Sequence, residues 1–322
     1  MSNKSNDFGR AYEYAWITAL YNVLHKTRQV EIEINSSYEA NKKAWDSLDD
    51  DTKEKYSVSA ETAIEALLEM EPKMVEVDDD NLKLHFQKDN FGIKGDVRDI
   101  IIGRESIDWK IGLSIKHNHE AIKHSRLSYK LDFGKEWFNV PCSDEYWDAI
   151  TPIFDVLKTK QGDNKKWSEL SSKESDIYKP LLIAFIEEVK RAYSREKQVP
   201  RRMVEYLIGF EDYYKIINRD DKCLTLIRTF NIHNTLNQPS KTKVSAITVP
   251  IIDLPTRLIA IEMKPNSNNT VEMFLDNGWS LSFRIHNAST IIEPSLKFDI
   301  QFIGMPLSVL TIECKWTLPN KN

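Results

Sequence analysis

The sequence contains no uninterrupted run of about 18 apolar residues, the length needed to span a membrane, so we expect no membrane contact. Its opening stretch, MSNKSNDFGR, is polar and lacks the apolar segment of a secretory signal. The three cysteines, Cys142, Cys223 and Cys314, form no CxxC pair, so neither a zinc knuckle nor a disulfide framework is expected. We therefore expect a cytoplasmic protein.

The chain does contain enough apolar residues for a sizeable core, because 41% of its 322 residues are hydrophobic. This length suits one large domain or two ordinary ones. The formal net charge is −5, but nucleic-acid binding depends on local patches rather than on the total. Residues 94–135 hold nine Lys and Arg against six Asp and Glu. Such a mildly basic region is compatible with salt-dependent DNA binding, and it is also typical of an ordinary solvated surface.

Hydrophobic periodicity predicts an α+β fold, with a mixed N-terminal part followed by a mostly β part. Helices are expected over residues 7–26, with Asp7 as the N-cap, and over 37–73 and 143–217. Strands are expected over 81–87, 100–102 and 111–115, and repeatedly from residue 223 onward. The pattern changes near 218–221, which predicts either two parts, 1–220 and 221–322, or one continuous fold.

Residues 95–118, GDVRDIIIGRESIDWKIGLSIKHN, read as a β-hairpin with a turn at 105–108. Symmetric antiparallel pairing around this turn places residues whose numbers sum to 213 opposite each other. Asp99 then faces Ser114, and Lys116 shares that face because side chains alternate along a strand. Asp96 falls on the other face unless a bulge intervenes. The spacing therefore gathers Asp99, Ser114 and Lys116 at one corner of a sheet.

This corner suits metal-dependent cleavage of a phosphodiester. A carboxylate can hold Mg²⁺, which polarises the phosphate and lowers the pKa of a water, and a nearby lysine offsets developing negative charge. The alternative is a surface hairpin with an incidental ion pair. Similar spacings elsewhere in the chain show that the pattern is common: Asp253 with Glu262 and Lys264, and Glu313 with Lys315.

Several stretches carry a resemblance to a known family: GDVRDIII, IGLSIKHNHEAIKHSRLS, GWSLSFRIHNAST and PSLKFDIQFIGMP. Together they resemble the HaeIII type II restriction endonucleases, which belong to the PD-(D/E)xK nuclease superfamily. The resemblance implies a nuclease-like mixed sheet flanked by helices and Mg²⁺-dependent cleavage of double-stranded DNA at GGCC, leaving blunt ends. It also implies a cognate methyltransferase as a functional partner that protects host DNA.

The same resemblance suggests roles for individual residues. Asp99 resembles the metal-binding acid, with Asp96 as the competing choice, and Lys116 resembles the superfamily lysine. Ser114 stands where the superfamily usually has Asp or Glu, and serine is a poorer Mg²⁺ ligand than a carboxylate. A second acid is therefore expected from elsewhere, and we favour Glu13 in the first helix over Glu120.

Two further regions are candidates for DNA contact. Asn118 and His119 could touch the DNA backbone, although Asn118 also suits the cap of a helix over 120–128. KHNHE at 116–120 is a poor match to an HNH nuclease, because consecutive strand side chains point to opposite faces.

Farther along, FRIHNAS and SLKFD supply Arg284, His286, Asn287 and Lys297 for base readout or phosphate contact, while Phe283 and Ile285 would anchor the opposite face. A polar sheet face without a ligand is the alternative. A palindromic recognition sequence would suit a homodimer, although some such enzymes act as monomers.

Three functions remain open at this point. The first is a Mg²⁺-dependent type II restriction endonuclease. The second is a DNA-binding protein that does not cut, which the serine at position 114 keeps in consideration. The third is a structure-specific repair or recombination nuclease built on the same core.

Overall fold

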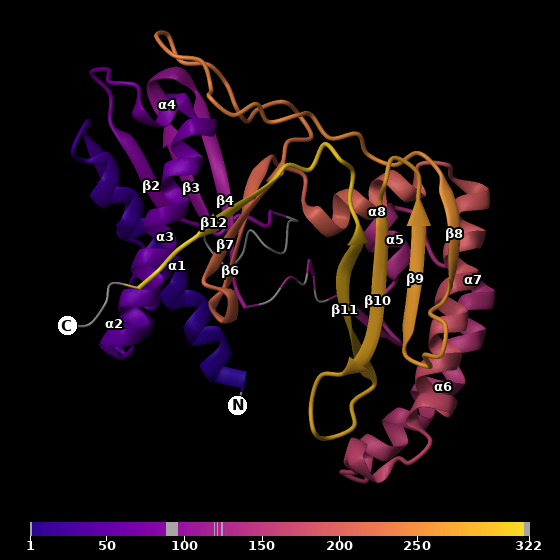
Figure 1. Ribbon diagram of the computed structural model, residues 1–322. Coiled ribbons are helices and arrows are strands. Elements are labelled where there is room, and N and C mark those ends of the chain that lie inside the picture. The colour runs from indigo at the N-terminus through magenta and orange to yellow at the C-terminus, as the bar shows by residue number, and fades with distance from the viewer. Residues whose placement is uncertain (1, 88–95, 119, 121, 124, 319–322) are drawn as a thin grey trace. The chain divides into compact units, whose positions relative to one another are not determined.

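The computed structural model describes residues 2–87, 96–118, 120, 122–123 and 125–318 (Figure 1). The chain forms two compact units that are interleaved in sequence. Unit 1 comprises residues 1–120, 210–252 and 307–322, and unit 2 comprises 121–209 and 253–306. The expected boundary at residue 220 falls in the turn between two paired strands of unit 1.

A seven-stranded mixed sheet forms the centre of unit 1, in the order β1-β2-β3-β4-β6-β7-β12. Most neighbours are antiparallel, but β4 pairs with β6 in parallel. The strands are β1 (Val30–Ile32), β2 (Leu82–Phe86), β3 (Ile100–Arg104), β4 (Trp109–His117), β6 (Tyr213–Arg219), β7 (Leu224–Phe230) and β12 (Thr311–Lys315). Short 3-10 turns at Glu105–Ile107 and Asp220–Lys222 join β3 to β4 and β6 to β7.

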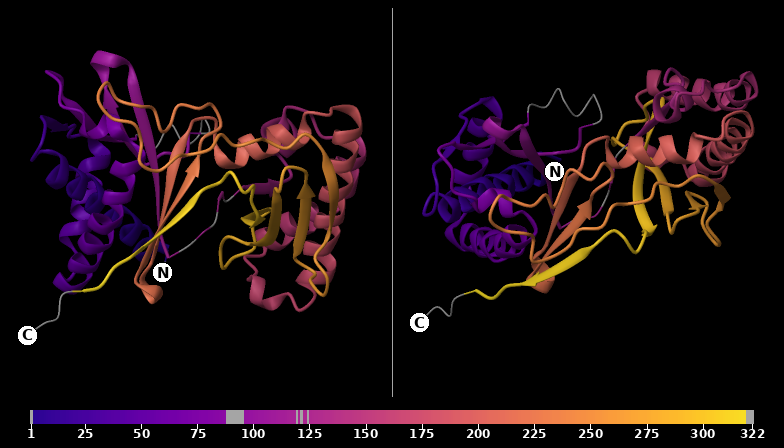
Figure 2. Two further views of the ribbon diagram at one scale, coloured as in Figure 1. Left: turned by 45° about the horizontal axis from the view of Figure 1, so that its top comes forward. Right: turned by 90° about the horizontal axis from the view of Figure 1, so that it is seen from above.

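Helices from the N-terminal segment pack against this sheet, as the indigo and purple ribbons show (Figures 1 and 2). They are α1 (Ser2–Leu24), α2 (Ser36–Asp46), α3 (Asp50–Met70) and α4 (Pro72–Val75). Trp16 of α1 and Ile64 of α3 are fully buried with Leu113 of β4 and Ile216 of β6 in one core. The predicted Asp7 cap is wrong, because α1 begins at Ser2 and passes through Asp7.

Unit 2 combines a five-stranded antiparallel sheet, in the order β5-β11-β10-β9-β8, with four α-helices among its described residues. The strands are β5 (Arg126–Ser128), β8 (Leu258–Met263), β9 (Thr270–Leu275), β10 (Ser280–Asn287) and β11 (Ser295–Gly304). The helices are α5 (Phe133–Phe138), α6 (Asp144–Gly162), α7 (Lys179–Arg195) and α8 (Val199–Ile208), with a 3-10 turn at Trp167–Glu169 and a π-helical turn at Glu174–Tyr178. Phe185 of α7 packs on Phe283 and Phe298 of the sheet, which joins the two layers.

The α+β class is confirmed, but three local predictions are wrong. The helix expected to run to residue 217 ends at Ile208, and Tyr213 already begins β6. Residues 244–249 form no strand. The described part of 120–128 contains strand β5 instead of a helix. Across the described residues, no helix is both long and apolar enough to cross a membrane.

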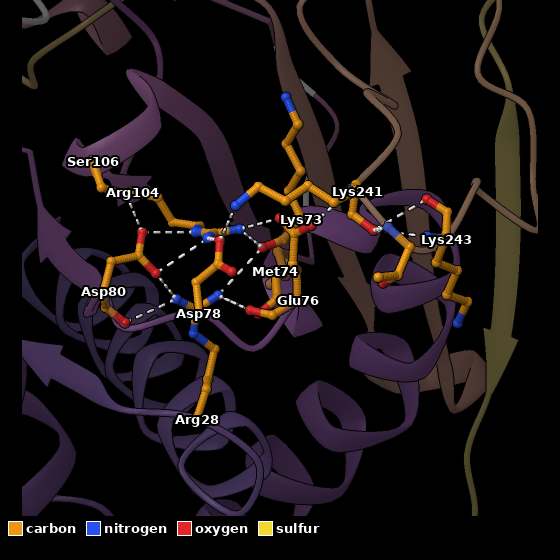
Figure 3. A network of polar contacts seen from close by, with 12 residues as sticks. Arg28, Lys73, Met74, Glu76, Asp78, Asp80, Arg104, Ser106, Lys241 and Lys243 are labelled. Atoms are coloured by element: carbon orange, nitrogen blue, oxygen red, sulfur yellow. Dashed lines mark hydrogen bonds and ion pairs between the residues drawn. The ribbon is translucent and has the colours of Figure 1, made fainter.

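A buried ion-pair network holds the β3–β4 turn against the segment after α4 (Figure 3). The Arg104 side chain is fully buried, and its nitrogens lie 2.6 Å from Glu76, 2.7 Å from Asp78 and 3.0 Å from Asp80. Arg28 also reaches Asp80, at 2.7 Å. Because buried charges need partners and hydrogen bonds, this network fixes one end of the hairpin.

Candidate catalytic site

The hairpin has the register predicted from its sequence. Ile100 pairs with Leu113, and Arg104 pairs with Trp109, so that each pair sums to 213. The ladder reaches Asp99, whose backbone N–H donates to the Leu113 carbonyl at 2.7 Å. Asp99 therefore lies at the end of β3 that is remote from the turn, beside the last residues of β4.

The Asp99 carboxylate is held by three donors from β4. Its Oδ2 accepts from the Ile115 backbone N–H at 2.6 Å, from Lys116 Nζ at 3.0 Å and from Ser114 Oγ at 3.4 Å. No hydrogen bond among the described residues is recorded to its Oδ1. The Asp99 and Lys116 side chains are each 24% exposed, so solvent and a substrate can reach them.

Glu13 of α1 belongs to the same group of charges. Its Oε2 accepts a hydrogen bond from Asn41 Nδ2 at 2.8 Å. Burial raises the pKa of Glu13 to about 8, and the negative charge of Asp99 raises it further, while Lys116, Asn41 and Arg10 act in the opposite direction. The structure thus brings the second acid favoured from the sequence into the electrostatic field of Asp99.

Lys116 responds to both carboxylates. Burial lowers the pKa of its ammonium, but the charges of Asp99 and Glu13 and the hydrogen bond to Asp99 outweigh this, so the pKa lies above its usual value. The ammonium is therefore charged at neutral pH. Two acids and one lysine share this corner of unit 1.

The competing acids are held by arginines. Asp96 accepts from Arg98 Nε at 2.8 Å and Nη2 at 2.7 Å, and from Gln87 at 2.5 Å. Glu120 pairs with Arg219 at 2.6 Å and with Arg228 at 3.1 Å. Since arginine neutralises each of these carboxylates, the geometry favours Asp99 and Glu13 over Asp96 and Glu120 as metal ligands.

Asn118 has a local structural role that the sequence did not reveal. It adopts a left-handed conformation, with φ of 56°, and its Oδ1 accepts from the Asp220 backbone N–H at 3.0 Å. His117 Nε2 lies 2.8 Å from Asp220 and 3.1 Å from the Tyr56 hydroxyl. The predicted helix cap by Asn118 is wrong, because Asn118 and His117 instead tie the end of β4 to the β6–β7 turn. His119 lies outside the described residues.

The second candidate region is the outward face of the unit 2 sheet. Phe283 and Ile285 are fully buried, while Arg284 and His286 point to the other face, as predicted. Arg284 lies opposite Asp299 and pairs with it at 3.0 Å, and His286 lies opposite Lys297. Asn287 is engaged locally, because its Nδ2 donates to the Ser289 carbonyl at 2.7 Å and its Oδ1 accepts from Tyr178.

The similar spacings elsewhere do not form comparable corners. Lys264 pairs with Glu272 at 3.3 Å, and Glu262 is exposed on β8. Glu313 and Lys315 are exposed on β12. Within the described part of the chain, no cluster of three or more His, Cys, Asp or Glu side chains is arranged to hold a metal ion. The Asp99 corner therefore offers two carboxylates, and any further ligands would be water or substrate oxygens.

Sequence reasoning missed Lys215, a buried lysine on β6 that pairs in register with Ser114. Residues 201–217 had been assigned to a helix, so nothing in that assignment brought Lys215 to the hairpin. Gly209, with φ of 95° at the end of α8, is the one local signal that the helix stops before this lysine.

Comparison with known proteins adds two findings. A family model described as HaeIII restriction endonuclease matches residues 9–306. Over 317 residues the chain is 53% identical to a protein named Type II restriction enzyme HaeIII, from Haemophilus aegyptius, and the match covers 98% of this chain and 99% of the relative. No solved structure matches the chain.

Proposed function

Because this chain belongs to the HaeIII restriction endonuclease family, and is thus a site-specific deoxyribonuclease, we propose that Asp99, Glu13 and Lys116 form its catalytic site. The observation that carries this proposal is the Lys116 ammonium 3.0 Å from the Asp99 carboxylate, with Glu13 in the same electrostatic field. Our proposal also places unit 1 among the PD-(D/E)xK nucleases, with the acid and the lysine on a hairpin and the second acid on the preceding helix.

Double-stranded DNA is the substrate of such an enzyme, and the proposed target is GGCC, cut to leave blunt ends. Family membership favours this function over a DNA-binding protein that does not cut and over a structure-specific repair nuclease. Two finer features belong to the proposal: a homodimer that matches the palindrome, and a methyltransferase that protects the same sequence in host DNA.

The residues present fit a divalent cation, and we propose Mg²⁺. Burial and the neighbouring Asp99 raise the pKa of Glu13 to about 8, which is the effect expected where two carboxylates share a partly desolvated space without a counter-ion of sufficient charge. Asp99 and Glu13 would hold the cation, and Mg²⁺ readily keeps waters and substrate oxygens in its remaining positions. Bound there, the cation would polarise the scissile phosphate and lower the pKa of a water.

The protein's own groups then have separate tasks. The Ile115 N–H fixes the orientation of the Asp99 carboxylate through a 2.6 Å hydrogen bond. The Lys116 ammonium is charged and fixed next to this acid, so it can donate to the attacking water or to a phosphate oxygen and offset the negative charge that develops there. His117 and Asn118 hold the strand end on which Lys116 lies.

Sequence recognition is assigned to the outward face of β10 and β11. Arg284 supplies the forked donor that guanine N7 and O6 accept in the major groove, and Asp299, paired with it, is an acceptor suited to cytosine N4. His286 and Lys297 lie next to them in the ladder and suit phosphate contact. Asn287 contributes to the shape of the strand end.

A plasmid digest tests the whole proposal. Wild-type protein with Mg²⁺ is expected to cut unmethylated plasmid into discrete fragments whose ends map to GGCC, and to leave GGCC-methylated plasmid intact. Asp99→Ala and Lys116→Ala are expected to retain binding to a GGCC duplex but not to cut, because they remove the metal-binding acid and the charge-stabilising lysine.

Asp96→Ala is the matched control for the acid, since Asp96 is three residues away and engaged by Arg98. Normal cutting by Asp99→Ala and Lys116→Ala would show that the hairpin is structural and would move attention to Asp253, Glu262 and Lys264. Retardation of DNA without cutting by the wild type would overturn the nuclease proposal itself.

A further inference from the structure

Lys215 lies in a row of polar side chains that crosses the centre of the unit 1 sheet. The parallel register pairs Ser114 of β4 with Lys215 of β6, and the antiparallel register pairs Lys215 with Arg228 of β7. Since Asp99 continues the same row on β3, four adjacent strands place Asp99, Ser114, Lys215 and Arg228 side by side. The row therefore runs from the proposed catalytic acid to two cations.

Lys215 is only 4% exposed, and its charge is not fully balanced. Burial lowers the pKa of Lys215 to about 7, and the positive charges of Lys116 and Arg228 lower it further, while Glu120 and Asp99 act in the opposite direction. Its Nζ donates to the Glu120 carbonyl oxygen at 3.2 Å. The lysine thus senses both Asp99 and Lys116, which places it in the same charged region.

Arg228 adds a second observation. Its Nη1 pairs with Glu120 at 3.1 Å, but its Nε is buried without a hydrogen-bond partner among the described residues. A buried N–H without an acceptor costs free energy, and guanidinium donors match the oxygens of a phosphate. A cation pair with such a donor, next to a catalytic acid of a DNA-cutting enzyme, is suited to an anionic part of the substrate.

We propose that Lys215 and Arg228 bind a phosphate group of the DNA strand that is being cut, next to the Asp99 corner. This inference rests on the proposed function and extends it to two residues on β6 and β7. The phosphate supplies the counter-charge that Lys215 lacks and an acceptor for Arg228 Nε. A purely structural role for Lys215, holding the Glu120 backbone in place, is the alternative that the experiment must separate.

The experiment compares wild type, Lys215→Met and Lys110→Met. Lys110 is an exposed lysine on the same strand as Lys116, roughly 20 Å away along β4, so it is the matched control. Equilibrium binding to a GGCC duplex is measured without divalent cation over a range of KCl concentrations, and single-turnover cleavage is measured with Mg²⁺. Thermal melting reports the fold of each protein.

For Lys215→Met we expect the slope of log K against log salt to fall in magnitude by about 0.9, because one phosphate contact is lost. Cleavage is expected to slow by about 100-fold or more, as for loss of one preorganised charge donor. The melting temperature is expected to stay the same or to rise, because a buried charge is replaced by an apolar side chain of similar length. Lys110→Met is expected to match wild type in all three measurements.

An unchanged salt slope and cleavage rate in Lys215→Met would overturn the inference, and so would a lower melting temperature with the wild-type slope, since that pattern marks a structural lysine. If Lys215→Met does not fold, Arg228→Gln reads the same phosphate: a reduced slope supports the inference and a wild-type slope overturns it. Failure of wild type to cut at GGCC would instead refute the proposed function, which the salt slopes do not measure.

Discussion

The raised pKa of Glu13 predicts that the protein binds its divalent cation more tightly as the pH rises. With a pKa of about 8, Glu13 is mostly protonated at neutral pH when no cation is bound, and a cation must displace this proton. The sign follows directly, because protons compete below the pKa and cease to compete above it. The apparent affinity for Mg²⁺ is expected to be weaker by about tenfold near pH 7 and about 100-fold near pH 6 than above about pH 9.

The assay is single-turnover cleavage of a GGCC duplex, with Mg²⁺ titrated at each pH. The quantity to plot is the Mg²⁺ concentration that gives half of the maximal rate, because hydroxide changes the maximal rate itself. This concentration is expected to fall about tenfold per pH unit below about pH 8 and then to level off. Asn41→Ala provides the internal check: it deletes a hydrogen bond that lowers the pKa of Glu13, so the levelling-off point should move to higher pH.

A half-saturating Mg²⁺ concentration that stays constant from about pH 6 to pH 8 would refute this reasoning. Folding stability without metal gives a second reading of the same group. Because the folded pKa lies above the unfolded value of about 4.5, the stabilising contribution of Glu13 is fully present below the unfolded value and is lost as the pH rises through about 8. Glu13→Gln should remove that loss, so the variant should melt at a higher temperature than wild type above pH 8.

Three further predictions concern other parts of the molecule. Lys116→Met is expected to slow single-turnover cleavage by about 10²–10³-fold while DNA binding without Mg²⁺ is retained, and equal losses of binding and cleavage would contradict this role. Arg104→Met leaves three carboxylates without their shared buried cation and is expected to cost about 3–5 kcal/mol in chemical denaturation, whereas Lys83→Met at an exposed pair should cost under about 1 kcal/mol; similar costs would argue against the network. Arg284→Ala is expected to reduce discrimination between GGCC and single-base variants by about 1–3 kcal/mol, and unchanged discrimination would remove β10 from base readout.

The catalytic hairpin could be predicted because its determinants are local. Apolar residues alternate with small or polar ones on either side of a short turn, and strand pairing around that turn follows from the spacing alone. The register of Ile100 with Leu113 therefore came directly from the sequence, and with it the meeting of Asp99 and Lys116. The alternation of Phe283 and Arg284 on β10 was predictable for the same reason.

The rest of the site depends on contacts between distant parts of the chain. Strand β6 pairs with β4 in parallel, although about 100 residues separate Lys116 from Ile217 in the sequence. The apolar pattern of α8 continues through residues 213–217, so periodicity alone extended the helix across β6. The interleaving of the two units was equally hidden, because unit 2 is inserted into unit 1 at two separate points.

Ser114 shows how local and distant contributions combine in this site. The residue is 2% exposed and lies in the sheet row between Asp99 and Lys215. A carboxylate at this position would be directly opposite Asp99 inside the sheet, where two negative charges repel strongly in a poorly solvated space. In our proposal Glu13 brings the second carboxylate from α1 instead, and the small serine leaves space for Lys215 on its other side. The substitution that looked like a defect in the hairpin thus allows an acid and a cation to flank one buried position.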